Sequence, residues 1–257
     1  MAGVVIDPSL GPWILVAGTV IGLLYGIFGV GTAFATPVLS MMGVPGLAAV
    51  VAPLPAILPS SAVSAYSYAR RGTVDWQLVR WCATAGLPAA VVGAIVSQWV
   101  GGPALLVISG LVPLVVGYRI LRPGSPVDVV VAARLRSRPA VVGVMAAGVG
   151  FSAGLLANGG GFLLVPLFLL LLGLDMNAAT GTSLLIASTL TAPTLATHLL
   201  LGDVDWTVAL WFALGVVPAA AIGARIAPRI DAARLRRGFG FLLVGFAAVY
   251  LVHLLAS

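Results

Sequence analysis

Long, uninterrupted runs of hydrophobic residues define the pattern of this chain. No charged residue occurs between Asp7 and Arg70, and four later stretches are also uncharged. Each stretch is at least as long as the roughly 20 residues that cross a bilayer as a helix. With Gly, Pro and charged residues as boundaries, the apolar runs predict eight segments, namely 13–42, 46–69, 76–99, 103–121, 140–172, 177–201, 206–228 and 236–256. The pattern therefore predicts an all-α, polytopic membrane protein.

Two of these segments are too long for a single crossing. A helix of about 30 residues would measure about 45 Å, whereas the hydrocarbon core of a bilayer is about 30 Å thick. Segments 13–42 and 140–172 both carry glycine clusters near their middles. We predict that each consists of two helices that meet at a break inside the membrane. Pro53, Pro55 and Pro59 should kink or break the second segment as well.

The chain contains an internal repeat. Residues 72–94 align with residues 202–224 at a constant offset of 130, with Val-Asp-Trp, Pro-Ala-Ala and Gly-Ala at equivalent positions. Upstream, the glycine cluster that begins at Gly26 resembles the one that begins at Gly154. The organisation predicted from this repeat is a first transmembrane repeat at 8–122, an Arg-rich cytoplasmic linker at 123–138 and a second transmembrane repeat at 139–257.

The composition supports a membrane protein and excludes a soluble globule. Hydrophobic residues make up 61% of the chain and charged residues 8%, against roughly a quarter charged in soluble domains. All 13 basic residues are Arg and all 7 acidic residues are Asp, which gives a net charge of +6. This excess is typical of cytoplasmic loops, and without a basic stripe beside exposed aromatics we expect no nucleic-acid partner. Cys82 is the single cysteine, so neither a disulfide framework nor a thiolate metal site can form within this chain, and we expect no metal and no cofactor.

The distribution of Arg tests how the long segments run, because Arg collects on the cytoplasmic side of a membrane. Eight simple crossings would place Arg on both sides. If 13–42 and 140–172 each turn back at their glycines, all 13 Arg lie on one side, while both termini, Asp203 and Asp205 lie on the other. The two repeats then have opposite orientations, which is the inverted-repeat plan of many secondary transporters. A parallel four-plus-four arrangement is the alternative.

The glycine clusters are the first candidates for a binding site. The candidate residues are Asn158, Gly159, Gly160 and Gly161 in the second repeat and Gly29, Gly31 and Thr32 in the first. Consecutive glycines allow a chain to unwind and expose amide N–H groups, and the helix that restarts after the break points its positive end at the gap, which favours an anion. Glycines spaced by four residues, at 18, 22 and 26 and at 150 and 154, are instead typical of close helix packing.

The segment 177–201 is rich in hydroxyl groups. They belong to Thr180, Thr182, Ser183, Ser188, Thr189, Thr191, Thr194 and Thr197. Hydroxyls solvate an oxyanion without a buried full charge, and Thr182 and Ser183 are the candidate ligands. The corresponding first-half segment has Ser60, Ser61 and Ser64. The alternative for each residue is a hydrogen bond to the backbone of its own helix, which is common in membrane helices.

Few ionisable residues lie within the apolar segments. His198 is a candidate for proton coupling, because histidine titrates near neutral pH, and the alternative is a position at the membrane interface. For Arg80 and Arg225, snorkelling to the head groups is a simpler account than attraction of anions. Asp75 and Asp205 each precede Trp at the start of a segment, where we expect them to cap helices.

Several motifs of the second half occur in the order and spacing of a known family. They are Gly154-Leu155-Leu156, Gly159 to Pro166, Ala179 to Ser183, Gly202 to Trp206, and Pro218 with Gly223. Together they resemble the TauE/SafE sulfite-exporter family, and through the duplication the resemblance covers essentially the whole chain. It implies a multi-pass transporter of a prokaryotic plasma membrane that exports sulfite, a sulfonate or a related anion. The first half departs from the family pattern at residues 29–34 and 51–54, which bears on the substrate more than on the transporter class.

The sequence favours a secondary transporter over other functions, and we expect no enzyme activity and no catalytic residue. An intramembrane hydrolase with Ser183 as nucleophile and His198 as base lacks the second glycine of a nucleophile elbow. A passive anion channel or a structural membrane subunit is the main alternative. Primary pumping is not expected, because the glycine run lacks the Gly-Lys-Ser/Thr of a nucleotide-binding loop. The expected partners are a small anionic substrate, the lipid bilayer and a proton or sodium ion, and a homo-oligomer is compatible with this plan.

Overall fold

The computed structural model describes residues 10–100, 102–121, 138–156, 161–202 and 204–256, and these residues form helices and short connections without a strand. The helices are α1 (Gly11–Phe28), α2 (Thr32–Met41), α3 (Gly46–Val51), α4 (Leu54–Ala69), α5 (Trp76–Val100), α6 (Gly102–Leu121), α8 (Pro139–Leu155), α9 (Gly161–Leu170), α10 (Met176–Leu201), α11 (Trp206–Ile226), the 3-10 turn η2 (Ala227–Arg229) and α12 (Ala232–Ala256). Within the described ranges, five helical stretches are long and apolar enough to cross a membrane: Gly11–Phe28, Leu47–Ala69, Trp76–Val100, Met176–Leu201 and Trp206–Arg229.

The predicted segment 13–42 is two helices that run in opposite directions. α1 ends at Phe28, and Gly29 follows with φ +75°, a left-handed conformation that glycine adopts at little cost. The Phe28 ring stacks on Phe239 with ring centroids 5.8 Å apart, whereas Phe34 in α2 meets Phe246, seven residues further along α12, at 4.5 Å. The chain therefore turns back at the glycines. The predicted segment 140–172 also contains two helices, α8 and α9, and residues 157–160 between them lie outside the described residues.

Proline interrupts the second predicted segment, as expected. α3 ends at Val51 and α4 begins at Leu54, with Pro53 between them. Pro55 lies in the first turn of α4, where its missing N–H costs no helical hydrogen bond, and Pro59 lies inside the helix. The segment 46–69 is therefore a short helix followed by a longer one.

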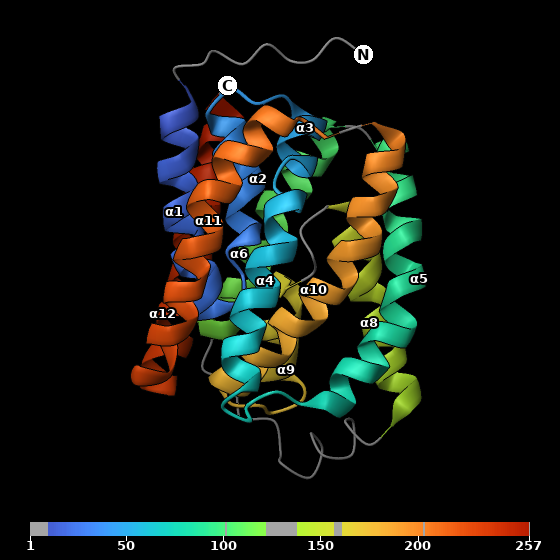
Figure 1. Cartoon of the computed structure of the whole chain (residues 1–257), viewed down its shortest axis with the longest axis vertical. Helices are drawn as coiled ribbons and strands as arrows, with labels where there is room; N and C mark the ends of the chain where they lie inside the picture. Colours follow the sequence, from blue (N-terminus) through green and yellow to red (C-terminus); the bar gives the residue numbers. More distant parts are fainter. Residues whose placement is uncertain (1–9, 101, 122–137, 157–160, 203, 257) are drawn as a thin grey trace.

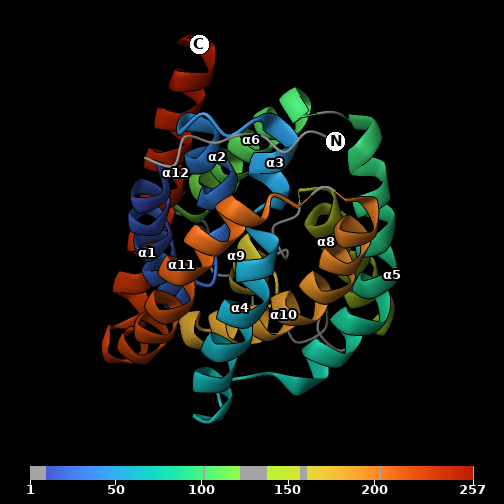
Figure 2. The ribbon, with the colours of Figure 1, turned by 45° about the horizontal axis from the view of Figure 1, so that its top comes forward.

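Two closely packed, parallel helix pairs join the N-terminal half of the chain to the C-terminal half. Figures 1 and 2 place the pair α1–α11 on one flank and the pair α5–α8 on the other, with α4 and α10 between them. A β-carbon at Gly26 would collide with the carbonyl oxygen of Ala220, and one at Gly154 would collide with that of Ala90. The glycines spaced by four are therefore packing positions. Ala90 and Ala220 are 130 residues apart, which is the offset of the internal repeat, so the two helix pairs meet at equivalent positions.

The described arginines gather at one end of the molecule. Figure 1 shows the end of α4, the start of α5, the end of α6, the start of α8, the end of α11 and the start of α12 together at the lower end. These helix ends carry Arg70, Arg71, Arg80, Arg119, Arg138, Arg225, Arg229, Arg234, Arg236 and Arg237. The Arg71 Nη1 donates a hydrogen bond of 3.1 Å to the carbonyl oxygen of Ala224, near the negative end of α11. We call this end the Arg-bearing end.

The first turn of α1 and the last turns of α12 lie at the opposite end (Figure 1). α1 and α4 run toward the Arg-bearing end, while α8 and α10 run away from it. The contacts agree, because the Tyr68 hydroxyl near the end of α4 reaches Gly26 near the end of α1, and the start of α5 contacts Thr182 near the start of α10.

Candidate functional site

The break between α1 and α2 lies against the C-terminal half. A β-carbon placed on Gly29 would be 3.1 Å from Ser183 Oγ in α10, 3.1 Å from Val165 Cγ2 in α9 and 3.3 Å from Thr180 Cγ2 in α10. Gly29 and Ser183, which the sequence placed in one candidate site, are therefore neighbours in the structure. A side chain at position 29 would be strained, because the backbone is left-handed and the neighbouring atoms would have to shift.

The carbonyl groups at the end of α1 have a partner that sequence reasoning missed. The fully buried Tyr68 of α4 donates its hydroxyl to the carbonyl oxygen of Gly26 at 3.1 Å, with that of Ile27 at 3.4 Å. Gly181 of α10 packs closely against the Tyr68 side chain, since a β-carbon at Gly181 would lie 2.7 Å from Tyr68 Cβ. A signal was available in the sequence, because Ser60, Ser64 and Tyr68 recur every four residues and so share one face of α4.

Thr182 joins two helices. Its Oγ1 accepts a hydrogen bond of 2.9 Å from the backbone N–H of Asp75, at the start of α5. The Asp75 carboxylate in turn accepts from the backbone N–H groups of Gln77 and Leu78. Asp75 is therefore an N-cap, as predicted, and Asp205 caps α11 in the same way.

Most hydroxyl groups of α4 and α10 donate to their own helices. Ser183 Oγ donates to the carbonyl oxygen of Thr180 at 2.9 Å, and Ser60 and Thr191 donate to carbonyl oxygens four residues before them at 2.7 Å. Thr194 bonds Leu190 in the same manner at 2.9 Å. The alternative that the sequence left open is confirmed for these residues. A hydroxyl engaged in this way offers its proton to the backbone and not to an anion.

Two buried Ser and Thr hydroxyls of α4 and α10 differ from the rest. Ser64 Oγ and Thr180 Oγ1 have no hydrogen-bond partner among the described residues, and their side chains are 0% and 1% exposed. An unpaired buried hydroxyl costs about 1–3 kcal/mol, and in native proteins such groups normally have a partner, such as a water molecule or a ligand. Thr180 lies beside the break at Gly29, and Ser64 lies one turn from Tyr68 on the same face of α4. Sequence reasoning had selected Thr182 and Ser183, and not Thr180, as candidate ligands.

His198 is fully buried in the last turn of α10, so its side chain faces other groups of the protein, and the alternative of a position at the membrane interface stays a prediction. It is 15 residues from Ser183 on the same helix. At 1.5 Å per residue this separation is about 22 Å, so the two side chains do not form one site. A hydrolase that pairs these residues is therefore excluded. Arg80 and Arg225 are exposed, which agrees with snorkelling.

The remaining candidates lie at or near the two breaks. Asn158, Gly159 and Gly160 lie outside the described residues, Gly161 is the first residue of α9, and Thr32 is the first residue of α2. A β-carbon at Gly31 would collide with the carbonyl oxygen of Ile21, so this glycine permits close packing of α2 on α1. Both breaks are thus followed by helices of 10 residues, whose N-terminal ends carry the partial positive charge of the helix dipole.

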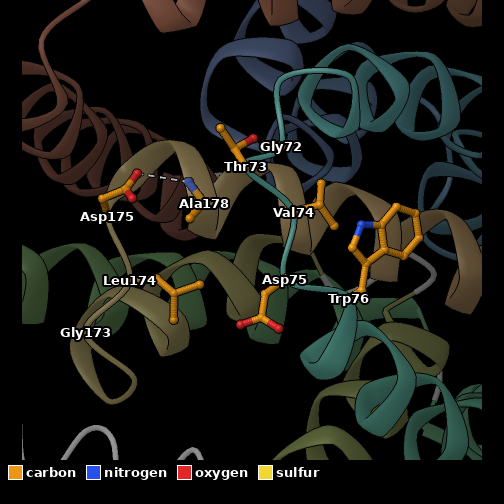
Figure 3. Close-up of a pocket in the computed structure, with 9 residues that line it drawn as sticks. All are labelled: Gly72, Thr73, Val74, Asp75, Trp76, Gly173, Leu174, Asp175 and Ala178. Atoms are coloured by element: carbon orange, nitrogen blue, oxygen red, sulfur yellow. Dashed lines mark hydrogen bonds between the residues drawn. The ribbon is translucent and has the colours of Figure 1, made fainter.

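A cavity of about 520 Å³ opens at the Arg-bearing end between the α4–α5 and α9–α10 connections. Figure 3 shows its lining, which comprises Gly72, Thr73, Val74, Asp75, Trp76, Gly173, Leu174, Asp175 and Ala178. Asp175 accepts from the N–H groups of Asn177 and Ala178 and so caps α10. Because Asp75 contacts Thr182 and Ala178 belongs to the lining, the cavity adjoins the start of α10, two residues from Thr180.

Comparison with known proteins gives consistent results. The family model described as "Sulfite exporter TauE/SafE" matches residues 14–251. A "Probable membrane transporter protein" of Xylella fastidiosa (strain 9a5c) is 29% identical over 251 residues, which cover 92% of each chain. The "Probable membrane transporter protein YjnA" of Bacillus subtilis (strain 168) is 25% identical over 238 residues, 85% of this chain and 91% of the relative. No solved structure matches the chain.

Proposed function

Because the chain belongs to the TauE/SafE sulfite exporter family, we propose that it is a secondary transporter that exports sulfite, a sulfonate or a related small anion. The observation that carries this proposal is the family match, which extends over almost the entire chain, from residue 14 to residue 251. The chain is a multi-pass membrane protein of a family of membrane transporters. The substrate class and the outward direction are our proposal, as is its location in the plasma membrane.

We further propose that the halves 8–122 and 139–257 are inverted repeats joined by the linker 123–138. Three observations support this. The glycine contact of α1 with α11, Gly26 against Ala220, has its counterpart in the contact of α8 with α5, Gly154 against Ala90. Equivalent helices such as α1 and α8 run in opposite directions, and the described arginines lie at one end of the molecule. The Arg-bearing end is then cytoplasmic, and both termini are outside. A parallel four-plus-four arrangement would orient α1 and α8 alike.

The proposed anion site lies between the two breaks. The anion lies near Gly31 and Thr32 at the start of α2 and near Gly161 at the start of α9, where the N-terminal ends of the two helices favour its negative charge. The N–H of Gly29 is not a donor to the anion, because it donates to the carbonyl oxygen of Tyr25 at 2.8 Å. The unpaired hydroxyl of Thr180 donates to the anion, with Ser64 as a second donor. Thr182 and Ser183 support the site by fixing α10 to α5 and by holding the Thr180 carbonyl oxygen.

Transport requires that the site open alternately to the two sides. In an inverted repeat the two halves exchange conformations, so the same residues line a path to either side. The cavity beside Asp75 and Asp175 supports a cytoplasmic path, because it adjoins the start of α10. His198, buried toward the other end of α10, is the proposed proton-coupling residue.

Counterflow in proteoliposomes tests this function. Vesicles loaded with unlabelled sulfite should accumulate external labelled sulfite transiently, and a panel of sulfonates and carboxylates should define the class by competition. A passive channel, the main alternative, also exchanges label, but it cannot drive net flux against a substrate gradient when a proton or sodium gradient is imposed. Gradient-driven accumulation therefore supports a carrier. Flux that only dissipates the substrate gradient would establish the channel instead.

A further inference from the structure

A groove of about 690 Å³ lies between α6 of the N-terminal half and α8 and α9 of the C-terminal half. Its walls are almost entirely apolar and include Val115, Val149, Leu167 and Leu170. The hydroxyl of Ser152, the polar uncharged side chain in the lining, donates to the carbonyl oxygen of Gly148 at 2.9 Å. The walls therefore offer hydrocarbon contact and almost no hydrogen bonds.

One charged residue, Arg119, belongs to this lining. It lies in the last turn of α6, at the Arg-bearing end, and is exposed. No hydrogen bond or ion pair joins Arg119 to another residue in the described part of the chain. The groove therefore has apolar walls and, where it reaches the Arg-bearing end, the positively charged side chain of Arg119.

We propose that the groove binds one anionic phospholipid, with an acyl chain along the apolar walls and the phosphate group on Arg119. Apolar walls match the acyl chain, and Arg is well suited to phosphate because it presents several N–H donors in a planar fork. In the proposed orientation the Arg-bearing end faces the cytoplasmic leaflet, whose negative surface potential also attracts the Arg119 side chain. The proposal depends on the membrane location and not on the transported substrate.

Native mass spectrometry of the purified protein with phosphatidylglycerol or phosphatidylcholine of the same acyl chains tests the site. We expect one phosphatidylglycerol to bind at least tenfold more tightly than phosphatidylcholine. Arg119→Gln should weaken the binding of phosphatidylglycerol about tenfold and leave the binding of phosphatidylcholine unchanged. Arg237→Gln, which removes an exposed arginine of α12, is the matched control and should change neither.

A second variant tests the acyl-chain contact. A β-carbon at Gly148 meets no atom within 4 Å, so Gly148→Phe should extend into the groove and weaken the binding of both lipids. Gly245→Phe, at an equally open position on α12, is the control and should not. Equal binding of phosphatidylglycerol by wild type, Arg119→Gln and Gly148→Phe would overturn the proposal. Displacement of the bound lipid by millimolar inorganic phosphate alone would also overturn it, because it would show a site for free anions.

Discussion

Replacing Thr180 with valine removes a buried hydroxyl while keeping the shape of the side chain. Thr180 is 1% exposed, its methyl group faces Gly29, and its Oγ1 has no partner among the described residues. If the hydroxyl is unpaired in the empty protein, its removal relieves part of a burial cost of about 1–3 kcal/mol. Thr180→Val should therefore fold as well as the wild type. A gain of about 1 kcal/mol would raise the Tm by about 2–4 °C in a chain of this size.

The same substitution should impair transport. A hydrogen bond to a charged group contributes about 1.5–3 kcal/mol, so its loss should weaken the apparent affinity for the anion about 10- to 150-fold. The assay is counterflow of labelled sulfite at increasing concentration, together with thermal unfolding of each purified variant. Stability and affinity should thus move in opposite directions, which general damage to the fold does not produce.

Thr194→Val is the matched control. Thr194 is also buried in α10, but its hydroxyl donates to Leu190 at 2.9 Å within the helix. This variant should keep the wild-type affinity and lose a little stability. Thr180→Val with raised stability and unchanged affinity would refute the reasoning, since the hydroxyl would then be an unpaired group without a role in binding. Ser64→Ala supplies an independent measurement on the second unpaired hydroxyl.

Three further predictions concern packing, coupling and orientation. Gly26→Ala should destabilise the protein by about 1–3 kcal/mol, the cost of overpacking, because the new methyl group meets the backbone of Ala220. An unchanged Tm would contradict the close pairing of α1 and α11. His198→Gln should retain counterflow but lose accumulation driven by a pH gradient, and equal pH-driven accumulation in the variant would remove His198 from coupling. A single cysteine at Asp203 should react with an impermeant reagent on intact cells and one at Arg136 should not, whereas the reverse result would invert the proposed orientation.

The sequence indicated several elements of the fold because their causes are local. Segment length against bilayer thickness required a break in 13–42, and glycine at position 29 supplied the left-handed residue at which α1 ends. The prolines at 53 and 55 located the boundary between α3 and α4. Asp75 and Asp205 were recognisable as caps because capping involves only the next few residues.

The candidate site was predicted less completely. Thr182, Ser183 and Thr180 are neighbours in the sequence and have similar side chains, so composition does not separate them. Their roles differ because Thr182 meets the start of α5, Ser183 bonds its own helix and Thr180 points its methyl group at Gly29. Tyr68 was missed for the same reason, since its partner at Gly26 is 42 residues away.

The sequence by itself determined the membrane character, the internal repeat, the breaks in the long segments and the asymmetric distribution of Arg. These properties follow from hydrophobicity, chain length and backbone preferences, which act over a few residues or over the whole composition. Only the tertiary structure decided that α1 pairs with α11 and α8 with α5, and which hydroxyls are left without a partner. Such outcomes depend on the close approach of backbones from distant parts of the chain. A glycine at position 26 therefore acquires its packing role only when Ala220 lies against it.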